Sequence, residues 1–294
     1  RKTMQKGQII KALAGFYYVK SQGQVYQCRA RGKFRKDSLK PLVGDYCEFS
    51  IENQTEGYIL SLLPRKNSLI RPPICNVDQA LLVFSAKEPD MNLLLLDRFL
   101  ILIEHLQIQP IICISKMDLV DSSLIYHQMK PYEDAGYQVL YVSSKQEQGI
   151  EAVKNIFKDK VTVVTGQSGV GKSSLLNALD IHLQIDTNEI SKALGRGKHT
   201  TRHVELIEMY GGYVADTPGF SSLELNIEPV DMAISYHDFH ELSKQCKFRG
   251  CLHESEPHCA VKNAVEQGKI SSQRYEHYLM FLKESKLLKE KKYG

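Results

Sequence analysis

The stretch VVTGQSGVGKSSLLNAL, from Val163 to Leu179, decides the fold. Its core, GQSGVGKS at 166–173, matches G-x-x-x-x-G-K-[ST] at every defined position, between a strand-like run and a helix-like run. Glycines in such a loop let backbone N–H groups surround phosphate oxygens, and the next helix adds the positive end of its dipole. The stretch therefore predicts a strand, a phosphate-binding loop (P-loop) and a helix, and these flanks argue against a chance glycine-rich turn.

The side chains of this loop have separate expected roles. Lys172 would reach the β- and γ-phosphates of a nucleotide, and the Ser173 hydroxyl would bind Mg²⁺. The residues expected to contact the nucleotide here are Gly166, Gln167, Ser168, Gly169, Val170, Gly171, Lys172, Ser173 and Ser174.

The segments around the loop alternate between strand-like and helix-like runs. From QALLVFSA at 79–86 onward this alternation predicts a parallel sheet with helices on both faces, followed by a hairpin over VELIEMYGGYVADTPG. The preceding short β-rich runs predict a small antiparallel barrel, and the polar C-terminal part reads as helical. The predicted domains are 1–70, 71–225 and 226–294.

Two motifs that follow predicted strands lie upstream of the loop. SKMD has the spacing of the guanine-specific N/T-K-x-D motif, and VSSK fits a second, weaker base-contacting motif. A carboxylate at Asp118 can accept hydrogen bonds from guanine N1–H and the exocyclic amine, whereas adenine would leave it unpaired. Lys116 would lay its stem over the base. The expected base-binding residues are Ser115, Lys116, Met117, Asp118, Ser143, Ser144 and Lys145.

The remaining parts of a nucleotide switch follow the loop. DTPG at 216–219 supplies Asp216 for the metal shell and Gly219, whose N–H can sense the γ-phosphate. GRGKHTTRH at 195–203 contains two threonines, of which we favour Thr201 over Thr200 as a second Mg²⁺ ligand. The sequence itself does not decide between them.

The residue after Gly219 is Phe220, where many GTPases have a water-orienting glutamine. A phenylalanine cannot hydrogen-bond to water, so we expect slow intrinsic hydrolysis. His199, beside the threonines, is the candidate to position the attacking water. The alternative is that His199 is a solvated loop residue.

The base motifs thus precede the P-loop in the chain, the reverse of the usual order. Neighbouring strands rather than chain order build a site in a parallel sheet, and termini can be rejoined at surface loops. The order predicts a circularly permuted P-loop GTPase domain.

A group of cysteines and histidines occupies CKFRGCLHESEPHC at 246–259. Three thiolates and one imidazole form a complete tetrahedral Zn²⁺ set with no open position, which predicts a structural metal. Cys246, Cys251 and Cys259 supply the sulfurs, and either His253 or His258 the imidazole. The four other cysteines, in separate strand-like segments, are expected to be reduced core residues: Cys28, Cys47, Cys75 and Cys113.

With the β-rich segment in front, this motif order, GRGKHTTRH and the cysteine cluster behind, the chain resembles the bacterial ribosome small-subunit-dependent GTPase A family over essentially its whole length. The resemblance implies an N-terminal OB-type barrel, a circularly permuted GTPase domain and a C-terminal helical domain with one Zn²⁺ per chain. It favours His253 as the imidazole ligand and supports His199 as a catalytic residue. Ser115 departs from the usual asparagine, so we expect weaker support of the loop and weaker guanine affinity.

Composition describes an ordinary globular chain of 294 residues, 43% hydrophobic and 24% charged, with a net charge of +4. No run is apolar enough to span a membrane and the N-terminus lacks a signal-peptide core, so we expect a cytoplasmic, monomeric protein. Basic runs at 29–36, 64–73 and 283–294 favour an RNA partner.

The expected function is hydrolysis of GTP to GDP. The resemblance implies a late assembly factor of the small ribosomal subunit that contacts rRNA and is stimulated by the subunit. One alternative is a nucleotide-gated rRNA-binding module in which hydrolysis is incidental. Another, an ATP-dependent RNA-processing enzyme, is disfavoured by Asp118.

Overall fold

The computed structural model describes residues 4–30, 39–70, 72–181, 204–215 and 223–293. The chain forms two compact units, each assembled from separate segments. The first unit contains Arg1–Leu81, Gly149–Thr165 and Lys172–Ser221, and the second contains Leu82–Gln148, Gly166–Gly171 and Ser222–Gly294. The three predicted domain ranges stay a prediction.

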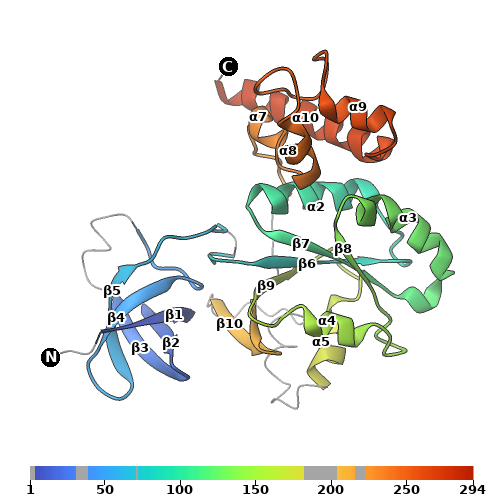
Figure 1. The fold of residues 1–294 in the computed structure, drawn as a ribbon. Helices are drawn as coiled ribbons and strands as arrows, with labels where there is room; N and C mark the ends of the chain where they lie inside the picture. The colour runs from blue at the N-terminus through green and yellow to red at the C-terminus, as the bar shows by residue number, and fades with distance from the viewer. Residues whose placement is uncertain (1–3, 31–38, 71, 182–203, 216–222, 294) are drawn as a thin grey trace. The chain divides into compact units, whose positions relative to one another are not determined.

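The first unit begins with a five-stranded barrel (Figure 1). Its strands follow the order β2-β3-β5-β4-β1, and pairing of β1 with β2 closes it. One pair, β3 with β5, is parallel, because strand directions cannot alternate all the way around a closed ring of five strands. The strands are β1 (Met4–Leu13), β2 (Phe16–Ser21), β3 (Gln24–Ala30), β4 (Tyr46–Ile51) and β5 (Glu56–Leu62). The predicted barrel is confirmed, and it is not purely antiparallel.

A hairpin and the strand before the P-loop complete the described part of the first unit. In the hairpin, β10 is antiparallel to β11, with Met209 opposite Gly212, and β11 runs parallel to β9. A Cβ at Gly212 would lie 1.8 Å from the Phe157 carbonyl oxygen, so this close approach requires glycine. The elements are α4 (Ile150–Asn155), β9 (Val161–Thr165), α5 (Lys172–Ile181), β10 (Val204–Met209) and β11 (Gly212–Ala215).

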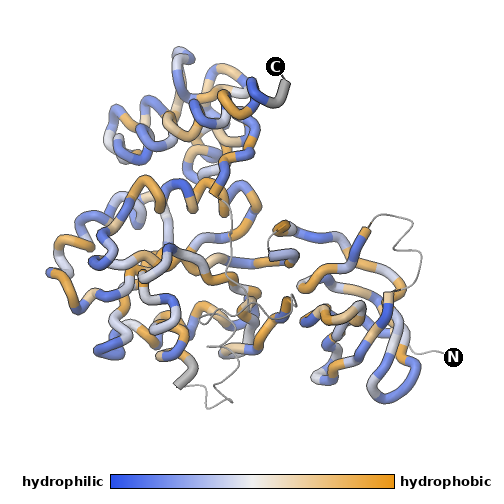
Figure 2. The backbone as a smooth tube through the Cα atoms, turned by 180° about the vertical axis from the view of Figure 1, so that it is seen from behind, coloured by the Kyte–Doolittle hydropathy of each residue, from blue (hydrophilic) through white to orange (hydrophobic). Residues whose placement is uncertain are grey.

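The second unit contains the strands that lead to the base motifs. In it, β6 lies beside β7, and β7 is parallel to β8. Figure 1 shows α2 and α3 beside these strands, and Figure 2 shows hydrophobic residues concentrated along the strands. All seven residues of β6 are buried, as its apolar run predicts. The elements are β6 (Gln79–Ser85), α2 (Leu93–His105), β7 (Gln109–Ser115), the 3₁₀ turn η1 (Met117–Leu119), α3 (Ser122–Asp134) and β8 (Gln138–Tyr141).

The C-terminal helices of the second unit pack against α2 (Figure 1). Arg98 of α2 donates to Glu284 Oε1 at 3.0 Å and to the Leu223 carbonyl at 3.1 Å. The helices are α7 (Pro229–Met232), α8 (His237–Ser243), α9 (Ala260–Glu266) and α10 (Ser272–Tyr293). Among the described helices, none combines the length and apolar character that crossing a membrane would require.

Candidate functional site

The two base motifs and the P-loop meet at the carboxyl ends of β7 and β8. Ser115 is the last residue of β7, and Ser143 lies two residues beyond the end of β8. Ligands of open α/β sheets bind outside the carboxyl ends of the strands. The motifs that are separated in sequence are therefore neighbours on the side of the sheet where a nucleotide would bind.

Ser115 holds the P-loop. Its hydroxyl donates to the Val170 carbonyl and lies 3.3 Å from the Phe84 carbonyl oxygen. The side chain is buried, with 2% of the residue exposed. The serine hydroxyl therefore reaches the loop directly, and the expected weaker support relative to an asparagine stays a prediction.

Lys116 forms a second link to the same loop. Its backbone is left-handed, with φ of 57°, and its ammonium donates to the Gly169 carbonyl at 2.8 Å and to the Glu88 carbonyl. A cation placed across two carbonyl groups joins the P-loop to the segment that follows β6. The sequence did not predict the contact with Glu88, because it is made by the backbone carbonyl, which every residue type has.

Asp118 is oriented by the second base motif. The Ser143 hydroxyl donates to Asp118 Oδ1 at 2.6 Å, and the Met117 N–H donates to the Val142 carbonyl at 3.1 Å. Ser143 is itself held by two backbone hydrogen bonds to Gln148, of 3.0 and 3.1 Å. A carboxylate held in this way is suited to accept two guanine donors.

The P-loop has the backbone that its glycines predict. Gly166, Gly169 and Gly171 have φ of 151°, 81° and 95°, and a Cβ on Gly166 would approach the Val83 carbonyl oxygen to 2.2 Å. Burial lowers the pKa of Lys172, the first residue of α5. The next two serines and the polar residues of the loop tip are exposed: Gln167, Ser168, Ser173 and Ser174.

Some predicted residues lie outside the described part of the chain. They are His199, Thr200, Thr201, Asp216, Gly219 and Phe220. Their predicted roles stay predictions.

The C-terminal cluster brings together three cysteines and one histidine. The ligand atoms of Cys246, Cys251, His253 and Cys259 all lie within 4.8 Å of one another, so the group could hold a metal ion. Backbone N–H groups point at two of the sulfurs: Ala260 N is 3.3 Å from Cys246 Sγ, and Lys262 N is 3.5 Å from Cys259 Sγ. Such donors favour the thiolate form that a metal needs.

The imidazole in this cluster is His253. Its Nε2 lies 3.0 Å from the Ala233 carbonyl oxygen, and its Nδ1 faces Cys259 Sγ at 3.3 Å. The carbonyl favours a proton on Nε2, which leaves Nδ1 free to bind a metal. Burial lowers the pKa of His253 and so favours the neutral ligand form. His258 is exposed and lies outside the cluster.

Comparison with known families gives a match over most of the chain. The RsgA GTPase family matches residues 62–226, and the RsgA N-terminal domain family matches residues 6–59. The chain belongs to the RsgA GTPase family. It is a GTPase with a circularly permuted P-loop domain, an N-terminal five-stranded barrel and a C-terminal helical segment with a Cys₃His cluster.

Relatives within the family are similar over nearly their whole length. "Small ribosomal subunit biogenesis GTPase RsgA" of Geobacillus sp. (strain WCH70) is 56% identical over 96% of this chain and 98% of that protein. The protein of that name from Bacillus subtilis (strain 168) is 55% identical, again over 96% and 98%.

Two solved structures also resemble the chain. YloQ, described as a circularly permuted GTPase, is 48% identical with a TM-score of 0.82, over 97% of this chain and 96% of that one. YjeQ from Thermotoga maritima is 37% identical with a TM-score of 0.82, over 96% and 99%.

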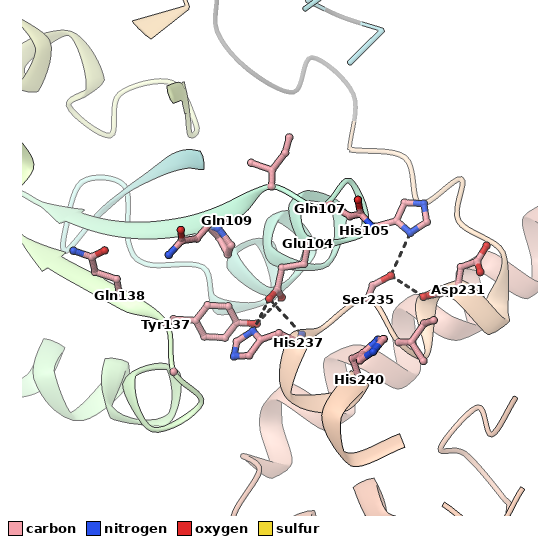
Figure 3. A pocket seen from close by; sticks show the side chains of 14 residues that line it. Glu104, His105, Gln107, Gln109, Tyr137, Gln138, Asp231, Ser235, His237 and His240 are labelled. Atoms are coloured by element: carbon pink, nitrogen blue, oxygen red, sulfur yellow. Dashed lines mark hydrogen bonds and ion pairs between the residues drawn. The ribbon is translucent and has the colours of Figure 1, made fainter. Parts of the chain in front are cut away.

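A cavity of about 710 Å³ lies at the opposite ends of β7 and β8 from the base motifs (Figure 3). In it, His237 Nδ1 is 2.5 Å from Glu104 Oε1, and Nε2 is 2.5 Å from the Ala135 carbonyl oxygen. The hydrogen bond that His237 donates to Glu104 raises the pKa of His237, because the imidazolium can donate to both acceptors. The described residues that line this cavity include three histidines and no lysine or arginine.

Two residues of a basic run that was expected to contact RNA form ion pairs within the protein. Arg65 makes a bidentate pair with the fully buried Asp45, with both N–O distances 2.7 Å, and Lys66 pairs with Asp78 at 2.6 Å. The sequence pattern did not reveal these partners. Contact of the basic runs with RNA stays a prediction, and most of the 29–36 run lies outside the described residues.

Proposed function

We propose that this chain hydrolyses GTP to GDP during biogenesis of the small ribosomal subunit. The observation that carries the proposal is the Asp118 carboxylate, oriented by Ser143 and placed beside a P-loop that Ser115 and Lys116 hold. This arrangement can select guanine and bind phosphates in one site. The names of the 55–56% identical relatives support the connection to the small subunit.

The chemistry of the site requires a metal ion and a positioned water. Ser173 has an accessible hydroxyl at the start of α5, which suits a ligand of Mg²⁺. Lys172 would contact the phosphates, with Thr201 as second Mg²⁺ ligand and Asp216 and Gly219 near the γ-phosphate. Bound Mg²⁺ would neutralise charge that develops on the phosphate oxygens.

We further propose that docking on the subunit stimulates hydrolysis late in assembly. Phe220 cannot orient water, and His199 is the residue that we assign to this task. A group that becomes ordered only on the subunit would couple hydrolysis to docking. The barrel and the basic C-terminal helix would contribute contacts to rRNA.

The Cys₃His cluster is proposed to bind one structural Zn²⁺. Three thiolates and an imidazole match the donor preference of zinc, and a full set leaves no position for a substrate. Bound zinc would stabilise the segment between α8 and α9. We also propose that the protein works as a cytoplasmic monomer.

Single-turnover hydrolysis of GTP, with and without purified small subunits, tests the function. We expect slow turnover alone and stimulation by subunits, and binding that weakens steeply with salt because cations on the protein release counterions from RNA. His199→Ala should keep GTP and subunit binding but lose most of the stimulated rate. Phe220→Ala, directly after the DTPG motif, is the control and should lose less.

Three results would contradict the proposal. Absence of GTP hydrolysis would exclude the enzyme. Hydrolysis without stimulation would exclude the role of the subunit and favour a nucleotide-gated rRNA-binding module. Full stimulation of His199→Ala would exclude the role of the histidine.

A further inference from the structure

The hydroxyl of Ser115 has two acceptors and a single hydrogen. It donates to the Val170 carbonyl of the P-loop, and the Phe84 carbonyl oxygen lies 3.3 Å from the same oxygen atom. The residue is 2% exposed, so these protein carbonyls rather than water occupy its surroundings. An asparagine at this position would bring two amide hydrogens instead of one.

Guanine presents two edges to a protein. Its N1–H and exocyclic amine are donors suited to Asp118, whereas O6 and N7 are acceptors that need donors. Ser115 lies three residues before Asp118 in the same motif and contacts the P-loop at Val170. Its hydroxyl is therefore a side-chain donor between the residue expected to bind the base and the loop expected to bind the phosphates.

Lys116 is a second side-chain donor of this motif that contacts the P-loop. Its ammonium lies 2.8 Å from the Gly169 carbonyl oxygen and also contacts the Glu88 carbonyl. These contacts direct its charge to the P-loop and the segment after β6. Among the described residues, the side chains of Ser115 and Lys116 thus both donate to backbone carbonyls.

We infer that this GTPase recognises guanine through Asp118 without reading N7, and that Ser115 is a positioning residue for the P-loop. The inference rests on the proposed binding of GTP. The ligand class is then any purine nucleotide with a guanine-type Watson–Crick edge, including one with carbon at position 7. The Ser115 hydroxyl thus stabilises the P-loop and forms no hydrogen bond with N7 of the base.

The test is equilibrium binding of GTP, 7-deaza-GTP, ITP and ATP to the purified full chain with Mg²⁺. The Kd of 7-deaza-GTP should lie within about twofold of that of GTP, because no hydrogen bond to the base is lost. ITP lacks the exocyclic amine and should bind about tenfold more weakly, since it loses a bond to a charged acceptor. A Kd for 7-deaza-GTP more than about fivefold above that of GTP would overturn the inference, because one net hydrogen bond has that value.

Variants of Ser115 separate positioning from base recognition. Ser115→Ala should weaken binding of GTP and 7-deaza-GTP by the same factor, and Ser115→Thr should restore both because it keeps the hydroxyl. Ser115→Asn should bind GTP about fivefold more tightly than 7-deaza-GTP, since the second amide hydrogen can reach N7. A change of the GTP to 7-deaza-GTP ratio in Ser115→Ala would contradict a pure positioning role.

The controls distinguish failure of this inference from failure of the proposed function. Equal binding of GTP and ATP, or no binding of GTP, would refute guanine recognition itself. Selective binding of GTP over ATP, together with poor binding of 7-deaza-GTP, would refute only the inference on N7. If Ser115→Ala does not fold, the ratio measured for the natural chain still decides the question.

Discussion

The nucleotide site and the metal cluster are preorganised in opposite ways. The cluster takes its ligands from one short segment, with Cys246 and Cys259 only 13 positions apart. The nucleotide site joins Ser115 to Val170, 55 positions apart, and Asp118 to Ser143, 25 positions apart. A parallel sheet and hydrogen bonds of the protein hold the second site, whereas the proposed Zn²⁺ would hold the donors of the first.

The two sites should therefore contribute differently to the stability of the folded protein. If the cluster binds the proposed Zn²⁺, this short segment with few apolar residues would gain its stability from the metal, and metal binding and local folding would be one event. A site at the ends of buried strands exists before its ligand arrives, and nucleotide binding adds only its own affinity. Loss of the metal should therefore unfold its surroundings, whereas loss of nucleotide should leave its site formed.

Removing a metal ligand should have the largest effect. Cys251→Ser should unfold the segment around α8 and α9 while GTP binding stays nearly unchanged, because structural zinc contributes on the order of 10 kcal/mol. Elemental analysis of the natural protein should find about one zinc per chain. Hydrogen exchange of 237–266 measures the unfolding, with His258→Ala as the matched control that keeps both zinc and protection. Freshly purified protein without zinc would refute the assignment.

Replacing Arg274 should have the next largest effect. The substitution tests whether ion pairs within the protein stabilise the packing of the C-terminal helices. Arg274 of α10 is buried and donates to Asp238 at 2.7 Å, with Asp97 4.0 Å away. Arg274→Met leaves Asp238 without this cation, while Asp97 keeps His277 at 2.5 Å, and the substitution should lower the free energy of unfolding by about 3–5 kcal/mol.

Urea denaturation followed by tyrosine fluorescence measures this loss, because the chain has 15 tyrosines and no tryptophan. The exposed Arg249→Met is the matched control and should leave the stability unchanged. A loss of less than about 1 kcal/mol from Arg274→Met would indicate that the buried charge is dispensable.

Replacing Asp118, the residue expected to bind guanine, should lower the affinity for GTP and leave the fold intact. Asp118→Asn loses the acceptor for two guanine donors, so GTP binding should weaken about a hundredfold, by the value of charged hydrogen bonds. The variant should partly favour XTP, whose C2 oxygen accepts from the new amide. Competition binding with GTP, XTP and ATP tests this, with the surface residue Asp134→Asn as control. An unchanged preference for GTP would remove Asp118 from the site.

The smallest expected effect is the pH dependence of the contact between α8 and α2. Glu104 raises the pKa of His237 above its unfolded value. This pair's contribution to the free energy of unfolding is therefore fully present below about pH 6.5, the pKa of histidine in the unfolded chain. It is lost as pH rises through the pKa of His237 in the folded protein. It should stay below about 1 kcal/mol, because His237 is partly exposed.

Comparing the unfolding free energies of the natural chain and His237→Gln between pH 5.5 and 8.5 tests this. The difference should shrink as pH rises, while the exposed control His127→Gln should show no such trend. A difference that grows with pH would contradict the assigned direction.

Patterns within short windows predicted most of the fold. The order of strands and helices, the P-loop glycines and the cluster at 246–259 each depend on neighbours in the chain, so the sequence shows them directly. The parallel pairing of β3 with β5 was not predicted, because it depends on barrel closure. The ion pair between Arg65 and Asp45 was not predicted, because the two residues are 20 positions apart in the chain.

The sequence by itself determined which groups the chain offers: a P-loop, a carboxylate in a motif that follows a strand, and three thiols with two candidate imidazoles at 246–259. Only the tertiary structure decided how these groups are held. It joined Ser115 to Val170, Ser143 to Asp118 and His253 to Ala233. The reason is that a hydrogen bond depends on the position and direction of two atoms, and for residues far apart in the chain the packing of strands and helices sets both.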